Sequence, residues 1–198
     1  MIVVDIETSG LDSVKNGIWQ IGAVDLDTGE EFLEESKIDK DDKILEEAMN
    51  ICQVTEDFLR DKTKQSQKQM LGNFFQWVAQ RKIKNFICQN PQFDMGFIKT
   101  KASKYNLQTP FHHRSFDTHS LAQLKHKIVH GDFLINKEKG RSQMNLSEVL
   151  KFCGMQDNRG AHNALEDAKL TAECFSRLTQ GKNFIKEYSK FKIPDYLK

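Results

Sequence analysis

The sequence predicts an α/β domain with a mixed central β-sheet, in which an antiparallel meander meets parallel strands and helices flank both sides. β-Branched residues open the chain and favour a strand over residues 2–6. A hairpin signal at residues 27–29 (Asp-Thr-Gly) separates two strand-like runs, residues 18–26 and 31–38, which completes the meander. A short apolar run at 85–89 then leads directly into a helix, as in the parallel part of α/β sheets.

Length and composition indicate one folded domain. The chain has 198 residues, of which 38% are hydrophobic and 29% are charged. This is long enough for a sizeable core and polar enough for a soluble protein. No run of 18 apolar residues occurs, so no membrane partner is expected. Met1 leads directly into a core strand, which leaves no room for a targeting peptide and favours a cytoplasmic location.

The remaining elements follow from helical spacing and from helix-start and helix-stop residues. Apolar residues recur at intervals of three and four from 44 to 84, around a polar stretch that is read as a helix start or linker. Later elements are expected at residues 91–105 (helix), 116–118 (weak strand followed by a helix to about 128), 125–141 (a basic loop or hairpin across a cleft), 145–152 (helix) and 163–178 (helix). Residues 1–178 are therefore expected to form one domain, and residues 179–198 a helical extension packed on it.

The cysteines and the charges narrow the possible functions. Four single cysteines (Cys52, Cys88, Cys153 and Cys174) without a Cys-x-x-Cys pair argue against a zinc site or a disulfide framework, and for buried free thiols in a reducing cytoplasm. Residues 25–47 hold 11 acids against 3 lysines, although the net charge of the chain is only +1. The rest of the chain is therefore basic, which suits a polyanionic partner bound on one side, although solvated faces give the same statistics.

Acidic residues stand where a sheet could hold a cation. Asp5 and Glu7 share one face of the first strand, with side chains about 7 Å apart, so that they repel each other unless a cation lies between them. A polar strand end is the plainer interpretation of these two residues alone. Asn90 and Pro91 are helix-start residues after the fourth strand, and they place Asp94 in the first helical turn, at the carboxyl end of that strand.

His162 and Asp167 complete the set of candidate residues. Five residues turn a helix by about 500°, so two helical side chains at this spacing point apart. His162 is therefore expected on the loop before the last long helix, with Asp167 inside the helix. The other five histidines are read as structural or solvated.

Three motifs carry a family resemblance. They read Asp5-Ile6-Glu7-Thr8-Ser9-Gly10-Leu11, Asn90-Pro91-Gln92-Phe93-Asp94, and His162-Asn163-Ala164-Leu165-Glu166-Asp167. In this order and spacing, over residues 1–178, the chain resembles the DEDDh 3′→5′ exonucleases of the DnaQ-like superfamily, the group of proofreading exonuclease subunits, ribonuclease T and oligoribonuclease. Gln89 and Pro91 depart from the His and Ala of many relatives. The tyrosine branch would need Tyr at position 163, and ribonuclease H would not keep Asp and Glu two residues apart on the first strand.

The resemblance implies a ribonuclease H-like fold, a metal-dependent nuclease and specific residue roles. Asp5 would bridge two divalent cations, Mg²⁺ or Mn²⁺, Glu7 and Asp167 would bind the ion on the side of the attacking water, and Asp94 would act directly or through water. His162 would be the general base, which suits the ordinary histidine pKa of about 6.5. The implied substrate contacts are the backbone of Thr8 and Ser9, a Leu11 wedge, and a wall of Asn90 and Phe93. Core packing is the alternative for Leu11 and Phe93.

The expected reaction is hydrolysis at the 3′ end of single-stranded nucleic acid, releasing nucleoside 5′-monophosphates, with DNA slightly favoured over RNA. An RNA-trimming exoribonuclease of the same family is one alternative. A catalytically idle nucleic-acid-binding or polymerase-associated module is another, and retention of all five catalytic residues argues against it. A polymerase or a second copy of the chain remains open as a protein partner. Lys99, Lys101 and residues 125–141 are candidates for contacts to the substrate backbone.

Overall fold

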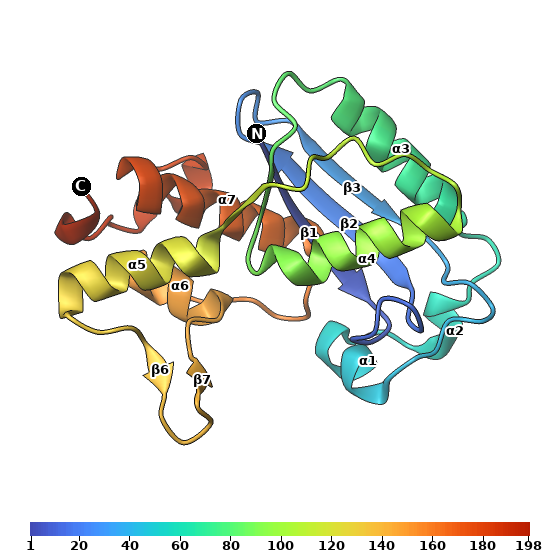
Figure 1. Ribbon diagram of the computed structural model, residues 1–198, viewed down its shortest axis with the longest axis horizontal. Helices are drawn as coiled ribbons and strands as arrows, with labels where there is room; N and C mark the ends of the chain where they lie inside the picture. Colours follow the sequence, from blue (N-terminus) through green and yellow to red (C-terminus); the bar gives the residue numbers. More distant parts are fainter.

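A five-stranded mixed sheet forms the centre of the protein, for which a computed structural model describes residues 1–198 (Figure 1). The strands are β1 (Ile2–Thr8), β2 (Ile18–Asp25), β3 (Glu31–Glu35), β4 (Phe86–Cys88) and β5 (Ser115–Asp117). They lie in the order β3-β2-β1-β4-β5. The β1–β2 and β2–β3 pairs are antiparallel, whereas β1–β4 and β4–β5 are parallel. The predicted α/β fold with a mixed sheet is confirmed.

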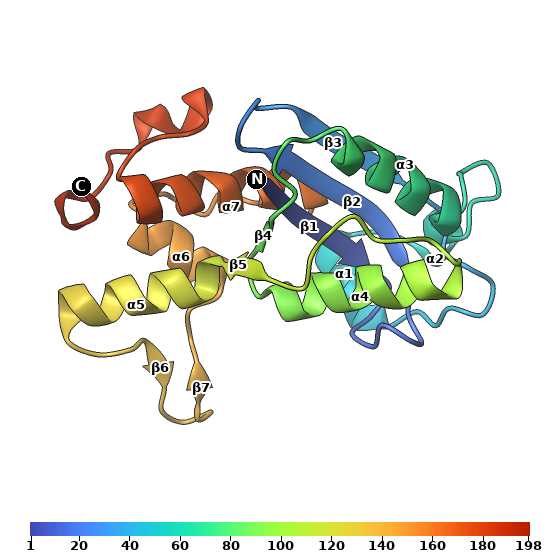
Figure 2. The same ribbon diagram turned by 45° about the horizontal axis from the view of Figure 1, so that its top comes forward.

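Helices cover both faces of this sheet (Figures 1 and 2). They are α1 (Glu46–Cys52), α2 (Glu56–Leu59), α3 (Gln67–Ala79), α4 (Pro91–Lys104), α5 (Thr118–His130), α6 (Leu146–Phe152), α7 (Ala164–Gln180) and two short 3₁₀ helices, η1 (Lys186–Lys190) and η2 (Asp195–Leu197). The strand alternation decides which helix each residue meets. Val4 and its neighbours two positions away pack against α3 and α4, whereas Val3 packs against α7.

Helix α7 lies unusually close to the sheet because β2 carries a glycine beneath it. A Cβ atom on Gly22 would lie 2.2 Å from the backbone of Ala164 and Leu165. The Gln20 side chain accepts a hydrogen bond from the Ala164 amide at 2.7 Å. Since α7 begins at Ala164, these two contacts fix where the helix starts over the sheet.

One lysine of helix α4 is buried, although the sequence predicts that it is exposed. Lys101 was expected to be exposed and free to contact a substrate, which is wrong: its side chain is 1% exposed and its Nζ lies 2.7 Å from an oxygen of Asp42. The same carboxylate accepts a hydrogen bond from Gln67 on α3. Lys104 pairs with Asp39 and Asp41. Part of the acidic 25–47 segment is thus neutralised by α4, because a buried charge requires a partner.

The segment after β5 extends away from the body of the protein. Helix α5 runs to His130, two residues beyond its predicted end, and Gly131 stops it with a positive φ of 89°. A hairpin of β6 (Ile135–Asn136) and β7 (Arg141–Ser142) follows and projects from the domain (Figure 1). We call residues 132–145 the arm.

The C-terminal residues pack on α7 through a buried charge. Arg177 is fully buried and pairs with Glu173 at 2.7 Å. Its guanidinium also donates to Asn183 and to the carbonyls of Cys153, Tyr188 and Phe191. All four cysteines are buried and free, as expected. No helix combines the length and the apolar character needed to cross a membrane.

Candidate active site

Acidic side chains from three elements meet at one end of the sheet. Asp5 and Glu7 lie on β1, Asp94 lies in the first turn of α4, and Asp167 lies in the first turn of α7. His162 lies on the loop just before α7, as its spacing from Asp167 requires. All five line a single cleft of about 370 Å³. The parallel β1–β4 pair explains this convergence, because the ends of parallel strands meet at one edge of a sheet.

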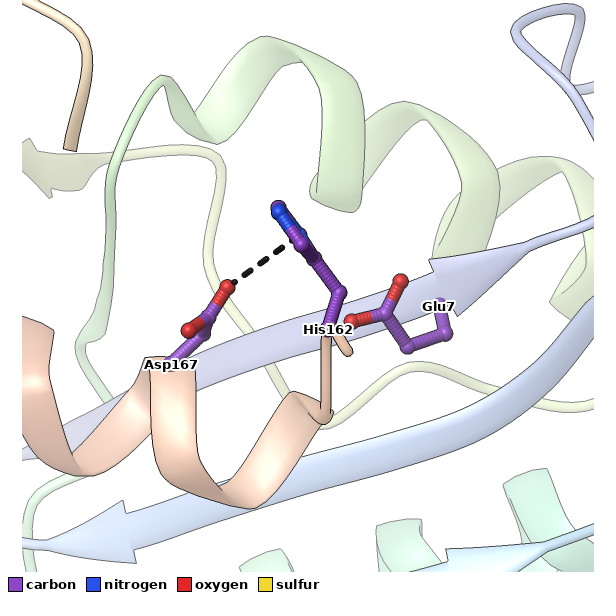
Figure 3. Close-up of side chains that lie close together, drawn as sticks. All are labelled: Glu7, His162 and Asp167. Atoms are coloured by element: carbon purple, nitrogen blue, oxygen red, sulfur yellow. Dashed lines mark ion pairs between the residues drawn. The ribbon is translucent and has the colours of Figure 1, made fainter. Parts of the chain in front are cut away.

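Glu7, His162 and Asp167 form the tightest group (Figure 3). One ligand atom from each of the three residues lies within 4.8 Å of the other two. The His162 Nδ1 atom is 3.5 Å from Asp167 Oδ2. The His162 side chain is 41% exposed, whereas the side chain of Asp167 is buried. A partly exposed imidazole therefore stands above buried carboxylates, where it can meet both solvent and a ligand.

Burial raises the pKa of the clustered carboxyls. The pKa of Asp5 is raised well above its ordinary value, first by burial and then by the charges of Asp94 and Glu7. Burial also raises the pKa of Glu7 to about 7 and that of Asp94 to about 7. Without a counter-charge, the ionised cluster is therefore unfavourable.

Two buried thiols orient two of these carboxyls, a feature that the sequence did not indicate. The Cys52 thiol donates to Glu7 Oε2 at 3.1 Å, and the Cys88 thiol donates to Asp94 Oδ2 at 3.0 Å. The Ile6 amide donates to the other Asp94 oxygen at 3.1 Å. Burial raises the pKa of both thiols, so they stay protonated and act as donors.

Arg159 is a cleft residue that sequence reasoning missed. Its Nη1 lies 3.1 Å from Asp167 Oδ2, and its other nitrogens bind Asp157 and Ser147. The Arg159 hydrogen bonds hold the pKa of Asp157 well below its usual range. Its position three residues before His162 was the available signal, but one arginine in a loop has no diagnostic spacing.

The carboxylates fit a divalent cation. Asp167 Oδ1 is buried and has no hydrogen-bond partner. A buried, unpaired carboxylate oxygen is costly unless a cation meets it. Together with Asp5, Glu7 and Asp94 it offers hard oxygen ligands, which favour Mg²⁺ or Mn²⁺ over softer metals.

The predicted substrate-binding residues divide into two groups. Thr8, Leu11, Asn90 and Phe93 line the cleft. The Leu11 side chain is 75% exposed, so core packing does not account for it, whereas Phe93 also contacts Phe97 in the core, at a ring-centroid distance of 4.9 Å.

Ser9 does not line the cleft, and its backbone and hydroxyl groups all bond to other parts of the protein. Its amide donates to the Gly17 carbonyl, its carbonyl accepts from the Leu45 amide, and its hydroxyl donates to the Lys43 carbonyl.

Asn90 has an unusual backbone. It is the N-cap residue of α4, as its place before Pro91 predicts, but its side chain makes no capping hydrogen bond and its φ of 66° lies in the left-handed region. Its backbone amide donates to Asp117 Oδ1 at 3.0 Å. This conformation costs about 1 kcal/mol or more in a residue with a Cβ atom. Asn90 is exposed and lines the cleft.

Helix α1 forms a cleft wall that the motifs did not indicate. Ala48 and Ile51 of α1, and Leu45 just before the helix, line the same cleft as Asn90. The Ile51 carbonyl accepts a hydrogen bond from the His162 amide at 3.5 Å, which links this wall to the histidine loop.

This arrangement matches a known family along nearly the whole chain. Residues 2–175 match the RNase_T family, described as Exonuclease. The chain belongs to this exonuclease family. The resemblance derived from the three motifs is therefore confirmed. The prediction that the chain is a nuclease is confirmed with it. Membership of the RNase_T family implies the use of divalent cations, and Glu7, His162 and Asp167 form a possible ligand cluster for one.

Curated relatives of this RNase_T domain include much longer proteins. DNA polymerase III PolC-type from Staphylococcus aureus (strain bovine RF122 / ET3-1) is 27% identical over 180 residues, which are 90% of this chain and 11% of the polymerase. The protein of the same name from Staphylococcus haemolyticus (strain JCSC1435) gives the same values. The chain thus spans 11% of the length of these relatives.

Solved structures share the fold. The nuclease domain of 3′hExo, a DEDDh family member bound to rAMP, has a TM-score of 0.68 at 14% identity, covering 98% of this chain and 95% of that one. E. coli Exonuclease I in complex with a 5cy-dT13 oligonucleotide has a TM-score of 0.71 at 17% identity, covering 91% of this chain and 41% of that one. The ribonuclease H-like fold is therefore that of known exonuclease domains.

Proposed function

We propose that this chain is a 3′→5′ exonuclease that hydrolyses phosphodiester bonds at the 3′ end of single-stranded nucleic acid and releases nucleoside 5′-monophosphates. The observation that carries this proposal is the convergence of Asp5, Glu7, Asp94, His162 and Asp167 on one cleft of an exonuclease-family fold. A module that only binds nucleic acid needs no such set of buried acids, since their mutual repulsion costs stability.

Asp5, Glu7, Asp94 and Asp167 are the proposed ligands of two divalent cations, Mg²⁺ or Mn²⁺. Such ions neutralise the phosphate, activate a water molecule and stabilise the departing oxygen. Asp167 Oδ1 is the strongest support for this assignment, because it is buried without a partner.

His162 is the proposed general base. Its partly exposed ring lies above Glu7 and Asp167, so it can take a proton from the attacking water and pass it to solvent. The hydrogen bond from the His162 backbone amide to the Ile51 carbonyl ties the loop that carries the ring to α1.

The cleft walls are proposed to receive the terminal nucleotide. Leu11 is a hydrophobic wedge that can contact the terminal base from one side, with Phe93 and Asn90 on the other. Thr8 lines the same cleft. Contact with apolar side chains is tolerant of base identity, which suits an enzyme that trims any sequence.

DNA is the substrate we favour over RNA, because the curated relatives are named as DNA polymerases. RNA trimming is the alternative, supported by the rAMP bound to the similar 3′hExo domain. A polymerase is accordingly a proposed protein partner. Measuring the mass of the purified chain, alone and with a candidate polymerase, distinguishes that partner from a second copy of the chain.

Digestion of matched 5′-labelled single-stranded DNA and RNA, with Mg²⁺ or Mn²⁺, tests the function. A ladder that shortens from the 3′ end is expected, and Asp5→Ala and His162→Ala should each abolish it. The faster substrate decides between DNA and RNA. Intact DNA and RNA with both metals would reject the nuclease function and favour a binding module, for which metal-independent binding by the Asp5→Ala protein is the positive result.

A further inference from the structure

Two further hollows lie in a row between the candidate active-site cleft and the arm. The cleft shares Gln89, Asn90 and Leu146 with a neighbouring cavity of about 410 Å³. That cavity in turn shares Ser142 and Asn145 with a third one of about 380 Å³. The three hollows therefore lie side by side, each sharing wall residues with the next. We call the two outer hollows the arm groove.

The arm is held in a fixed orientation. Gln123 of α5 is buried, and its side chain donates to the Leu134 carbonyl and accepts from the Leu134 amide, both at 2.9 Å. The same side chain donates to the Ser142 hydroxyl at 2.6 Å, so one residue ties both sides of the hairpin to the domain. The buried Met144 anchors the returning strand. The arm therefore presents a defined surface, although it projects from the domain (Figure 2).

The residues that line the arm groove suit a ligand that carries several negatively charged groups. The outer end of the groove is lined by Lys139 and Arg141 together with amide side chains, and no acidic residue lines it. The residues that line this outer end are Asn136, Lys139, Arg141, Ser142, Gln143 and Asn145, none of which is hydrophobic. Guanidinium and ammonium groups bind phosphates, and this outer end has no aromatic residue on which a base could stack. The one aromatic ring that lines the arm groove is that of His119, in the hollow next to the cleft.

A buried acceptor at the junction adds a second requirement. Gln89 lies where the cleft meets the groove, and its Nε2 donates to the Met144 carbonyl at 3.0 Å. Its Oε1 is buried and has no partner. A phosphate cannot satisfy this oxygen, since phosphate oxygens accept hydrogen bonds, but a sugar hydroxyl or a base amino group can donate to it. The ligand expected here carries both anions and donors.

We propose that the arm groove binds the single-stranded nucleic acid on the 5′ side of the nucleotide held in the cleft, with Lys139 and Arg141 on its phosphates. This assignment rests on the exonuclease function proposed above and adds the path of the strand. The path explains why the basic 125–141 segment lies beside a cleft that is itself acidic.

One other path leaves the cleft at Asn90. A hollow over α4 is lined by Lys99 and His113, but Asp117 also lines it. Only one permanently cationic side chain faces that hollow, against two in the outer arm groove. Because phosphate contacts dominate the affinity of proteins for nucleic acid, the arm groove is the better track.

Binding of 5′-fluorescein oligonucleotides of two, four and eight nucleotides tests the path. Fluorescence anisotropy in Mg²⁺ with full-length Asp5→Asn protein avoids cleavage, and DNA and RNA series run in parallel. In this background the affinity should rise with length. The double substitution Lys139→Glu/Arg141→Glu should remove on the order of tenfold of that rise and lower the salt dependence of eight-nucleotide binding by about 1.4 in log–log slope. The neutral pair Lys139→Gln/Arg141→Gln should give a smaller loss in the same direction.

A control of equal charge change is Lys182→Glu/Lys186→Glu, two exposed residues outside the groove. It should retain the length dependence. The assignment is overturned if the arm variants keep the full rise in affinity, or if Lys99→Glu removes it instead. Failure of the nuclease function is separate, because it appears as intact substrate with the unmodified protein, whereas this test measures binding alone.

Discussion

The Arg159 guanidinium lies 3.1 Å from Asp167 Oδ2, inside a cleft whose acids are suited to metal ions. Asp167 therefore has one oxygen neutralised by the protein and one, Oδ1, without a partner. The arginine supplies part of the positive charge that the acidic cluster needs, and it competes with a cation for the same carboxylate.

Replacing Arg159 with Gln should strengthen cation binding, because it removes a positive charge beside Asp167. We expect Mn²⁺ affinity to rise on the order of tenfold, measured by calorimetry on the metal-free protein. Arg114→Gln, at an exposed position outside the cleft, is the matched control and should leave the affinity unchanged. Weaker Mn²⁺ binding by the Arg159 variant would mean that the arginine supports the metal site.

Replacing His162 with Gln separates a base from a ligand. As a general base, His162 contributes about 10²–10⁴-fold to kcat, so the substitution should cost that much. Mn²⁺ affinity should stay close to that of the unmodified protein. A parallel loss of affinity and activity would instead identify His162 as a metal ligand, which its position within 4.8 Å of the Glu7 and Asp167 ligand atoms permits.

Stability without metal should fall as the pH rises. In the folded protein the pKa of Glu7 and of Asp94 is raised to about 7, against ordinary values of about 4 in the unfolded chain. Between about pH 4 and 7 the folded state therefore holds protons that the unfolded state has released, so the free energy of unfolding decreases through this window.

Urea unfolding in EDTA at pH 5 and pH 8 measures this decrease. The Glu7→Gln/Asp94→Asn double variant should lose less stability between the two pH values than the unmodified protein. Adding Mn²⁺ at pH 8 should restore stability only where the carboxylates are present. An equal fall in both proteins would mean that other groups cause it.

Adding a methyl group at Gly22 should disturb the site without touching a polar group. A Cβ atom there would lie 2.2 Å from the α7 backbone, so Gly22→Ala should force the helix away and destabilise the fold by about 1–3 kcal/mol. Activity should fall because Asp167 moves with α7. Gly72→Ala in α3 is the control: a Cβ atom there would meet nothing within 4 Å outside its own turn of helix, and the change should stabilise the protein by about 0.5–1 kcal/mol. If Gly22→Ala changes neither stability nor activity, α7 can move away from the sheet without cost.

Replacing the buried Arg177 with Met should leave Glu173 without its ion-pair partner. Removing one member of a buried pair costs about 3–5 kcal/mol, and urea unfolding measures it. Lys192→Met, at an exposed position, should have little effect. If the two variants have equal free energies of unfolding, Arg177 stabilises the protein through its methylene groups rather than through its charge.

The strand and helix order was predictable because local patterns agree with the fold. The alternation around Val4, the hairpin at Thr28 and Gly29, and the Asn90-Pro91 helix start each encode their element locally. The end of β3 was harder to predict from the sequence: the strand stops at Glu35 instead of Ile38. Ser36 still bonds to the neighbouring strand, but Lys37 turns away to pair with residues near α3.

The grouping of the acids was predictable from three motifs, whereas their surroundings were not. Tertiary contacts bring three further residues to the site, Arg159, Cys52 and Cys88. Their spacing in the sequence does not predict these contacts. The burial of Lys101 was missed for the same reason, since its partner Asp42 lies 59 residues away. A lysine on an amphipathic helix is usually solvated, and only the distant carboxylate reverses this.

The hydrogen bonds of Arg177 also bear on the order in which the protein is assembled during synthesis. Three of its partners, Asn183, Tyr188 and Phe191, are translated after α7 itself. Until they leave the ribosome, the Arg177 guanidinium lacks these acceptors and the segment that covers this end of α7 is absent. The C-terminal half of the helix that carries Asp167 should therefore reach its final packing only after residues 183–191 have been synthesised.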